Sequence, residues 1–180
     1  MKLVREHINE ISLGGSHLER MGVGMKASIK KWFDAAGVSP RNYKINDDLS
    51  IDVIGNLYLT GTPITSLPDN LSVKGSLDLR GTQITSLPDN LSVERSLYLS
   101  GTPITSLPDN LSVGGHLDLR GTQIISLPDN LSVGGNLDLE GTQITSLPDN
   151  LSVEGNLYLG TPITSLPKDL KVKGTIYKDF

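Results

Sequence analysis

The segment from Leu131 to Asn150 reads LSVGGNLDLEGTQITSLPDN, and close copies of it fill most of the chain. The string LPDNLSV, which joins the end of one copy to the start of the next, occurs five times at intervals of 20 residues. A fixed period in this range is typical of stacked repeat proteins, in which each unit contacts only its neighbours. The sequence therefore predicts a solenoid with one long ordered surface.

Each unit carries a strand-forming core with the pattern Leu-x-Leu. In an extended strand the two leucines lie on one side and the middle residue on the other. We expect successive strands to stack in parallel, ~4.8 Å apart. The cores begin at Leu57, Leu77, Leu97, Leu117, Leu137 and Leu157. A column of isoleucines continues the predicted core at Ile64, Ile84, Ile104, Ile124, Ile144 and Ile163. Leucines and valines of the LPDNLSV string complete each layer.

The stretch Leu137–Ile144 fits the pattern LxLxxNxL with Thr142 in the Asn position, and it resembles the leucine-rich repeat family. The resemblance covers about residues 51–180, and the short period and recurring Leu-Pro resemble the bacterial class, whose members include secreted effectors. It implies an α/β-class leucine-rich-repeat solenoid with short parallel strands in a curved sheet and a mostly extended or 3-10 convex side. It also implies a buried threonine ladder, bonded to neighbouring backbone, from Thr62 to Thr161.

Residues 1–45 do not repeat, and we expect them to form a helical cap on a solenoid spanning residues 46–180. Apolar residues from Met25 to Ala36 recur at helical spacing, and Gly37 ends that helix. A shorter helix is expected within residues 2–12, and an extended segment within residues 43–53. The alternatives are a basic helix on a membrane surface or a separate binding role. The opening also resembles the helical leaders of repeat proteins from gut bacteria and their phages.

The C-terminal end departs from the repeat. Leu159-Gly160-Thr161 lacks one residue at the strand exit, so the turn there must differ. The segment KDLKVKGTIYKDF is a partial unit that we interpret as the terminal strand. Its lysines would discourage unwanted strand addition at an open edge. They are Lys168, Lys171, Lys173 and Lys178.

Composition argues against several classes of function. The chain has no cysteine, which removes disulfides, thiolate metal sites and cysteine nucleophiles. The formal charge of −4 argues against nucleic-acid binding. The charged N-terminus predicts no signal peptide, and no apolar window is long enough for a membrane span. We expect a cytoplasmic protein, either in its own cell or in the cytoplasm of a host cell.

No catalytic, cofactor or metal site is predicted. The histidines His7, His17 and His116 have no metal-ligand spacing, and no nucleophile or phosphate-binding motif occurs in its required context. An aspartate recurs in every Pro-Asp-Asn turn, from Asp69 to Asp149. A calcium site needs several ligands from one loop, so we expect these aspartates to form turns through hydrogen bonds to backbone.

Differences between repeats concentrate in three columns around Leu-x-Leu, which we expect to point outward from the strands. Tyr and Arg are favoured at binding hot spots. The candidate partner-binding residues are Tyr58, Asp78, Arg80, Tyr98, His116, Asp118, Arg120, Asp138, Glu140 and Tyr158. Among them His116 reads as a neutral surface substitution. Tyrosine and aspartate alternate through the first four units, which is consistent either with duplication of a 40-residue pair or with a binding surface.

The leading hypothesis is a non-catalytic module that binds another protein through this face. The resemblance adds a setting: a bacterial or phage protein acting on a host or defence protein. Carbohydrate binding on the tyrosines is the first alternative. Self-assembly into a homo-oligomer through the C-terminal edge strand is the second.

Overall fold

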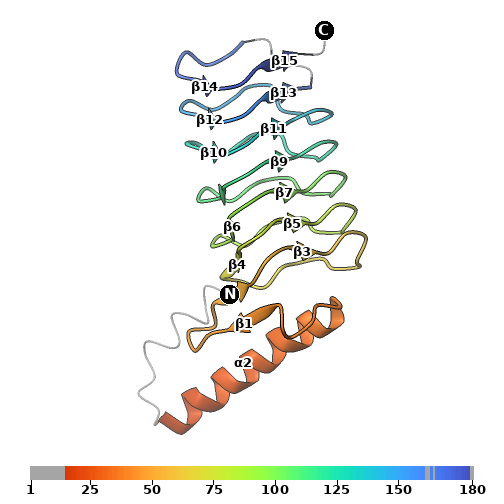
Figure 1. The fold of residues 1–180 in the computed structure, drawn as a ribbon, viewed down its shortest axis with the longest axis vertical. Helices are drawn as coiled ribbons and strands as arrows, with labels where there is room; N and C mark the ends of the chain where they lie inside the picture. Colours follow the sequence, from red (N-terminus) through yellow and green to blue (C-terminus); the bar gives the residue numbers. More distant parts are fainter. Residues whose placement is uncertain (1–14, 161–162, 164, 179–180) are drawn as a thin grey trace.

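The computed structural model describes residues 15–160, 163 and 165–178 of the chain, and it is a β-solenoid with one helix at its N-terminal end (Figure 1). The predicted solenoid with a helical cap is confirmed. Strands of successive coils stack along the long axis, and each pairs with its counterparts in the coils before and after it.

The Leu-x-Leu segments form a seven-stranded parallel sheet. Its strands are β3 (Leu57–Tyr58), β5 (Leu77–Asp78), β7 (Leu97–Tyr98), β9 (Leu117–Asp118), β11 (Leu137–Asp138), β13 (Leu157–Leu159) and β15 (Ile176–Lys178). The predicted terminal strand is β15, at one edge of this sheet, and Lys178 pairs with Leu159 in the position of a core leucine.

The repeat pattern predicts one sheet, and the structure has two. The Leu-Ser-Val segments form an eight-stranded sheet, because their extended backbones stack with the same period. Its strands are β1 (Tyr43–Ile45), β2 (Ile51–Val53), β4 (Leu71–Val73), β6 (Ser92–Val93), β8 (Ser112–Val113), β10 (Ser132–Val133), β12 (Ser152–Val153) and β14 (Lys171–Val172). Only β1 is antiparallel, paired with β2 in the segment expected to be extended.

The strands stay in register along the whole stack. Leu77 pairs with Leu97 and Leu137 with Leu157, each 20 residues apart, whereas Leu157 pairs with Ile176 after 19 residues. The unit that is one residue shorter is therefore shortened in its connecting segment, and the strand pairing is not shifted. At Gly160 an added side chain would meet the backbone of Glu140 at 2.7 Å, so this tight exit requires glycine.

The interior contains aliphatic columns contributed by every coil. The strand leucines from Leu57 to Leu159 are buried, and so are the isoleucines from Ile84 to Ile144. In the end layers Ile64 and Ile163 are only partly buried. The predicted columns thus form one continuous core.

The buried threonine ladder is confirmed in four coils, whereas Thr62 makes the same bond but is only partly buried. Thr82, Thr102, Thr122 and Thr142 are buried, and the Oγ1 of each donates a 2.7 Å hydrogen bond to the carbonyl of the leucine three residues earlier. The acceptor belongs to the same coil, so the ladder fixes each strand exit rather than linking coils. Thr161 lies outside the described residues.

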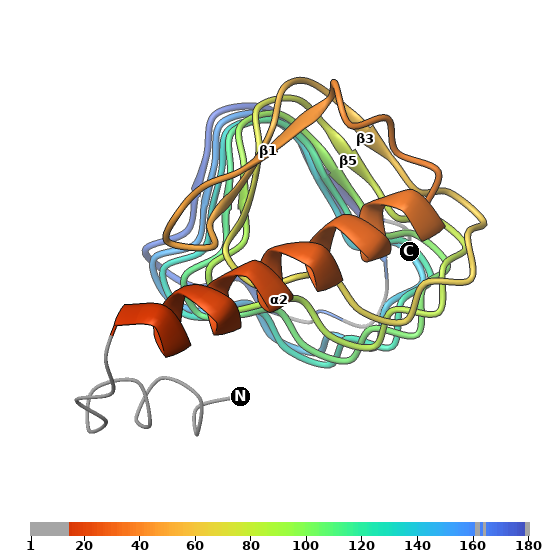
Figure 2. The same cartoon turned by 90° about the horizontal axis from the view of Figure 1, so that it is seen from below.

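Helix α2 (Gly15–Ala35) lies across the N-terminal end of the coils (Figure 2). It ends as predicted: Gly37 has a φ of 73°, its N–H bonds to Asp34, and the N–H of Val38 bonds to Phe33. These two bonds form a Schellman cap. The shorter helix expected within residues 2–12 lies outside the described residues.

Aromatic side chains join α2 to the first coil. Phe33 is fully buried and stacks on Tyr43, with ring centroids 3.9 Å apart. The indole N–H of Trp32 donates to the carbonyl of Ser66 at 3.2 Å, and Lys26 pairs with Asp47 at 2.7 Å. The helix thereby covers apolar surface that the terminal coil would otherwise expose.

Candidate binding face

The outer side of the seven-stranded sheet carries the candidate residues. Its central row follows the strand register from Tyr58 through Asp78, Tyr98, Asp118, Asp138 and Tyr158 to Tyr177. We use the name binding face for this row together with the flanking residues Arg80, Arg120 and Glu140. The face thus brings nine of the ten candidates onto one surface, and His116 lies in the column beside it.

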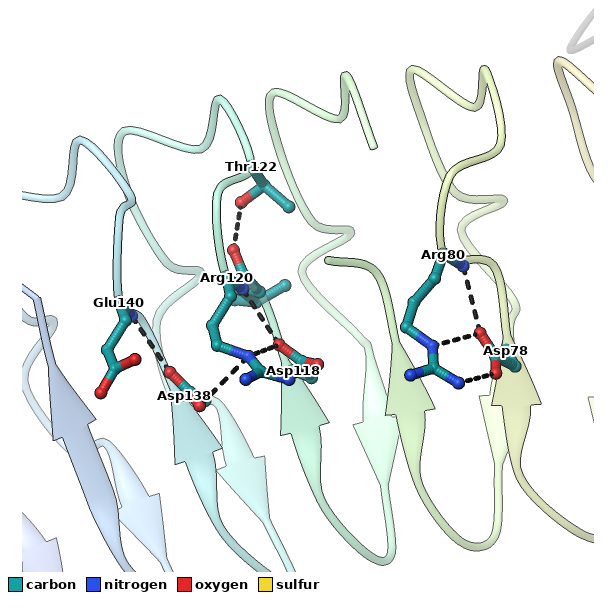
Figure 3. A network of polar contacts seen from close by, with 8 residues as sticks. Asp78, Arg80, Asp118, Arg120, Thr122, Asp138 and Glu140 are labelled. Carbon is teal, nitrogen blue, oxygen red and sulfur yellow. Dashed lines mark hydrogen bonds and ion pairs between the residues drawn. The ribbon is translucent and has the colours of Figure 1, made fainter. Parts of the chain in front are cut away.

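Asp78 and Arg80 form a bidentate ion pair, which the sequence interpretation did not include. The Arg80 Nε donates to Asp78 Oδ1 at 2.9 Å and Nη2 donates to Oδ2 at 2.6 Å (Figure 3). Asp78 is only 3% exposed, whereas the Arg80 side chain is 49% exposed. Burial raises the pKa of Asp78, but the hydrogen bonds to its carboxylate and the charge of Arg80 together outweigh burial, and the pKa is lowered overall.

Asp118 and Arg120 repeat this geometry two coils later, with N–O distances of 3.0 and 2.8 Å. The pKa of Asp118 is lowered in the same way, since the bonds from Arg120 outweigh its burial. The expectation that the three columns face solvent is therefore wrong for Asp78, Asp118 and Ser96, which are buried. Each carboxylate lies beneath its arginine and holds that arginine in place.

The third aspartate has no arginine of its own, because Glu140 occupies that position. Asp138 lies 3.4 Å from the Arg120 Nε and accepts the backbone N–H of Glu140 at 3.1 Å (Figure 3). Burial dominates here and raises the pKa of Asp138. The coil with Asp138 and Glu140 is consequently the acidic part of the binding face.

The tyrosines lie in three different surroundings. The guanidinium carbon of Arg80 lies 5.4 Å from the centre of the Tyr98 ring, within cation–π range. Tyr158 and Tyr177 stack on each other, with centroids 4.8 Å apart. Tyr58 is 66% exposed, and its hydroxyl lies 2.5 Å from Asn56 Nδ2.

His116 belongs to a hydrogen-bond ladder that the sequence interpretation missed. Each side chain in its column accepts the backbone N–H of the residue one coil further on. The acceptors are Asn56 Oδ1, Ser76 Oγ, Ser96 Oγ, His116 Nδ1, Asn136 Oδ1 and Asn156 Oδ1. His116 Nδ1 lies 2.8 Å from Asn136 N, so the neutral ring carries its proton on Nε2. The interpretation of His116 as a neutral surface substitution is therefore incomplete.

The asparagines shape the Pro-Asp-Asn turns. Asn70, Asn130 and Asn150 take positive φ values of 55–63°, which asparagine tolerates better than most residues. Asn90 Nδ2 donates to Asn70 Oδ1 at 3.1 Å, so the asparagines also link adjacent coils. Among residues 15–160, 163 and 165–178, no group of three or more His, Cys, Asp or Glu side chains is placed to hold a metal ion.

Comparisons with family models, with curated proteins and with solved structures found no match. Over the part of the chain that the structure describes, no helix is long and apolar enough to cross a membrane.

Proposed function

We propose that this chain is a non-catalytic module that binds another protein through the binding face. The observation that carries the proposal is the pair of arginines fixed by buried aspartates. Ordering a flexible side chain on binding costs about 0.5–1.5 kcal/mol. Arg80 and Arg120 are already held at two points each, so this cost is reduced while half of each side chain stays exposed.

The aromatic residues support the same function. Tyr58, Tyr98 and Tyr158 lie in one row, the arginines flank that row, and Tyr and Arg are enriched at the hot spots of protein interfaces. Carbohydrate stacking is less well supported, because a sugar needs a free ring face. Arg80 lies over Tyr98, and Tyr158 and Tyr177 cover each other, so among these four tyrosines Tyr58, 66% exposed, offers the free ring.

The biological setting is proposed from the sequence resemblance alone. In this setting the chain is a bacterial or phage leucine-rich repeat protein that acts in a cytoplasm and binds a host or defence protein.

The test is an affinity measurement with a partner recovered from the native cell by the full chain and then purified. We expect Arg120→Ala and Tyr98→Ala each to weaken binding at least tenfold. Ser112→Ala, on the eight-stranded sheet, is the matched control and should leave the affinity unchanged. Equal affinities for all three correctly folded variants would exclude the binding face as the site.

A further inference from the structure

The binding face reads nearly the same from either end. Over the six strands from β3 to β13 its exposed or half-buried tyrosines, arginines and glutamate are, one to a coil, Tyr58, Arg80, Tyr98, Arg120, Glu140 and Tyr158. Because these strands pair in register, successive coils are ~4.8 Å apart along the stack, and the arginines and Glu140 lie two residues further along their strands than the tyrosines. Reversing the order of the coils and laying the face on the original brings Tyr58 against Tyr158 and Arg80 against Glu140, each within its own column.

We propose that the binding face pairs with the same face of a second copy of this chain. The two solenoids run antiparallel, related by a two-fold axis that lies parallel to the strands between β7 and β9. Such an interface is isologous, so every contact occurs twice. The inference rests on the proposed function, since it names a partner for the same face.

The charged residues match in this arrangement. Arg80 of each copy lies opposite Glu140 of the other, and Asp138 beside it offers a second carboxylate. Asp138 also comes opposite Asp78, but that carboxylate is 3% exposed and already covered by Arg80.

The remaining positions also match. Arg120 comes opposite Ser100, in the coil of Tyr98, and Tyr58 comes opposite Tyr158. An axis parallel to the strands sets each column against itself. In the column of His116, each contact between the two copies therefore joins two polar side chains that can form hydrogen bonds, such as Ser96 of one copy and His116 of the other.

The matched area predicts a weak dimer. Six strands and three columns cover an area of about 25 by 14 Å on each copy. This is less than half of the roughly 800 Å² that a stable interface buries on each partner. We therefore expect association at tens of micromolar or above, which leaves the face accessible to a different protein at low concentration.

The repeats themselves supply the test variants. Arg80→Glu gives the second unit the Leu-Asp-Leu-Glu sequence of the fifth, and Glu140→Arg gives the fifth the Leu-Asp-Leu-Arg sequence of the second. The fifth unit shows that the fold accepts Leu-Asp-Leu-Glu where Asp138 lies 3.4 Å from the Arg120 Nε; Arg80→Glu also removes the partner of the buried Asp78, so its stability is measured beside its association. Either change alone sets like charges against each other twice, whereas the double variant restores both pairs. A mixture of the two single variants also restores both pairs, in a heterodimer.

The measurement is sedimentation equilibrium from about 5 µM to 1 mM. We expect the average molecular mass of the wild type, the double variant and the 1:1 mixture to rise above the 19.3 kDa of one chain as the concentration increases. The mass of each single variant should stay at that of one chain. Lys74→Glu is the control for charge reversal on the other sheet, and it should associate like the wild type. Circular dichroism checks that every variant is folded.

Three results would overturn the inference: a monomeric wild type, single variants that still dimerise, or a mixture that does not associate. Dimers that persist in the single variants would instead implicate another surface, such as the terminal strand. If the inference fails while Tyr98→Ala still weakens binding to a different protein, the proposed function stands. If dimerisation follows the charge pattern and no other partner depends on the face, only the inference stands.

Discussion

The side-chain ladder through His116 gives the sharpest prediction about stability. His116 Nδ1 accepts the N–H of Asn136 at 2.8 Å, and the same position in other coils holds asparagine or serine. We expect His116→Asn to keep the ladder, because asparagine already performs this role at residues 56, 136 and 156. His116→Leu keeps a side chain of similar size but removes the acceptor.

The expected loss follows from one hydrogen bond. A typical bond contributes about 0.5–1.5 kcal/mol, and a buried group left without a partner costs up to about 3 kcal/mol. His116 is exposed, so water can reach the freed N–H of Asn136. We therefore expect a loss of about 1 kcal/mol for His116→Leu, or about 2–4 °C in melting temperature for a chain of this size.

Urea unfolding followed by circular dichroism gives the global free energy of unfolding for the wild type and both variants. Hydrogen exchange of the Asn136 amide, followed by NMR, reports the local bond. We expect faster exchange in His116→Leu and unchanged exchange in His116→Asn. If the two variants match in stability and in Asn136 exchange, the side chain does not support the ladder and the reasoning fails.

Four further predictions concern other groups. Asp118→Asn should destabilise the fold by about 1 kcal/mol or more at neutral pH, because it weakens a charge-assisted pair. The lowered pKa of Asp118 stabilises the folded state above pH ~4, and this is lost as the pH falls through the folded-state value. The raised pKa of Asp138 acts in the opposite direction: it stabilises the folded state below pH ~4, and that stabilisation is lost as the pH rises. Asp138→Asn should therefore raise the free energy of unfolding at neutral pH. Urea unfolding of both aspartate variants from pH 3 to 7 checks these two predictions. Tyr43→Phe should raise the free energy of unfolding by about 1 kcal/mol, because its buried hydroxyl has no hydrogen-bond partner among the described residues; an unchanged or lower value in urea would count against this. Gly24→Ala should raise the melting temperature, since it lies within α2 with open space around the added carbon and alanine favours helix by about 1 kcal/mol; calorimetry measures the shift.

Much of the fold follows from the period. The 20-residue interval and the Leu-x-Leu pattern predict the solenoid, its core columns and the register, because each layer faces the same packing problem as the next. The second sheet was not predicted, since a short Leu-Ser-Val segment looks the same whether it pairs or only runs extended. The position of Gly37 predicts the end of α2, whereas its start at Gly15 could not be predicted across Gly22 and Gly24, which disfavour helix.

The candidate site was predicted by position but not by chemistry. The columns identify which residues share the face, and comparing the repeats shows where they differ. The ion pair between Asp78 and Arg80 could have been found, because residues two apart on a strand share one side. The ladder could also have been found, since asparagine, serine and histidine share an acceptor close to the backbone. Only coordinates could establish that Asp78 and Asp118 are buried.

The ladder also limits how this protein can diverge. Its column looks like free surface, yet each side chain must present an acceptor to the next coil. An alanine or valine there would leave the N–H of the next coil without its acceptor, even where no partner binds. The rule acts in one direction, because each side chain supports the following coil and not the preceding one. A newly duplicated unit thus arrives with the acceptor that its successor needs, which lets the array lengthen by whole units without further change.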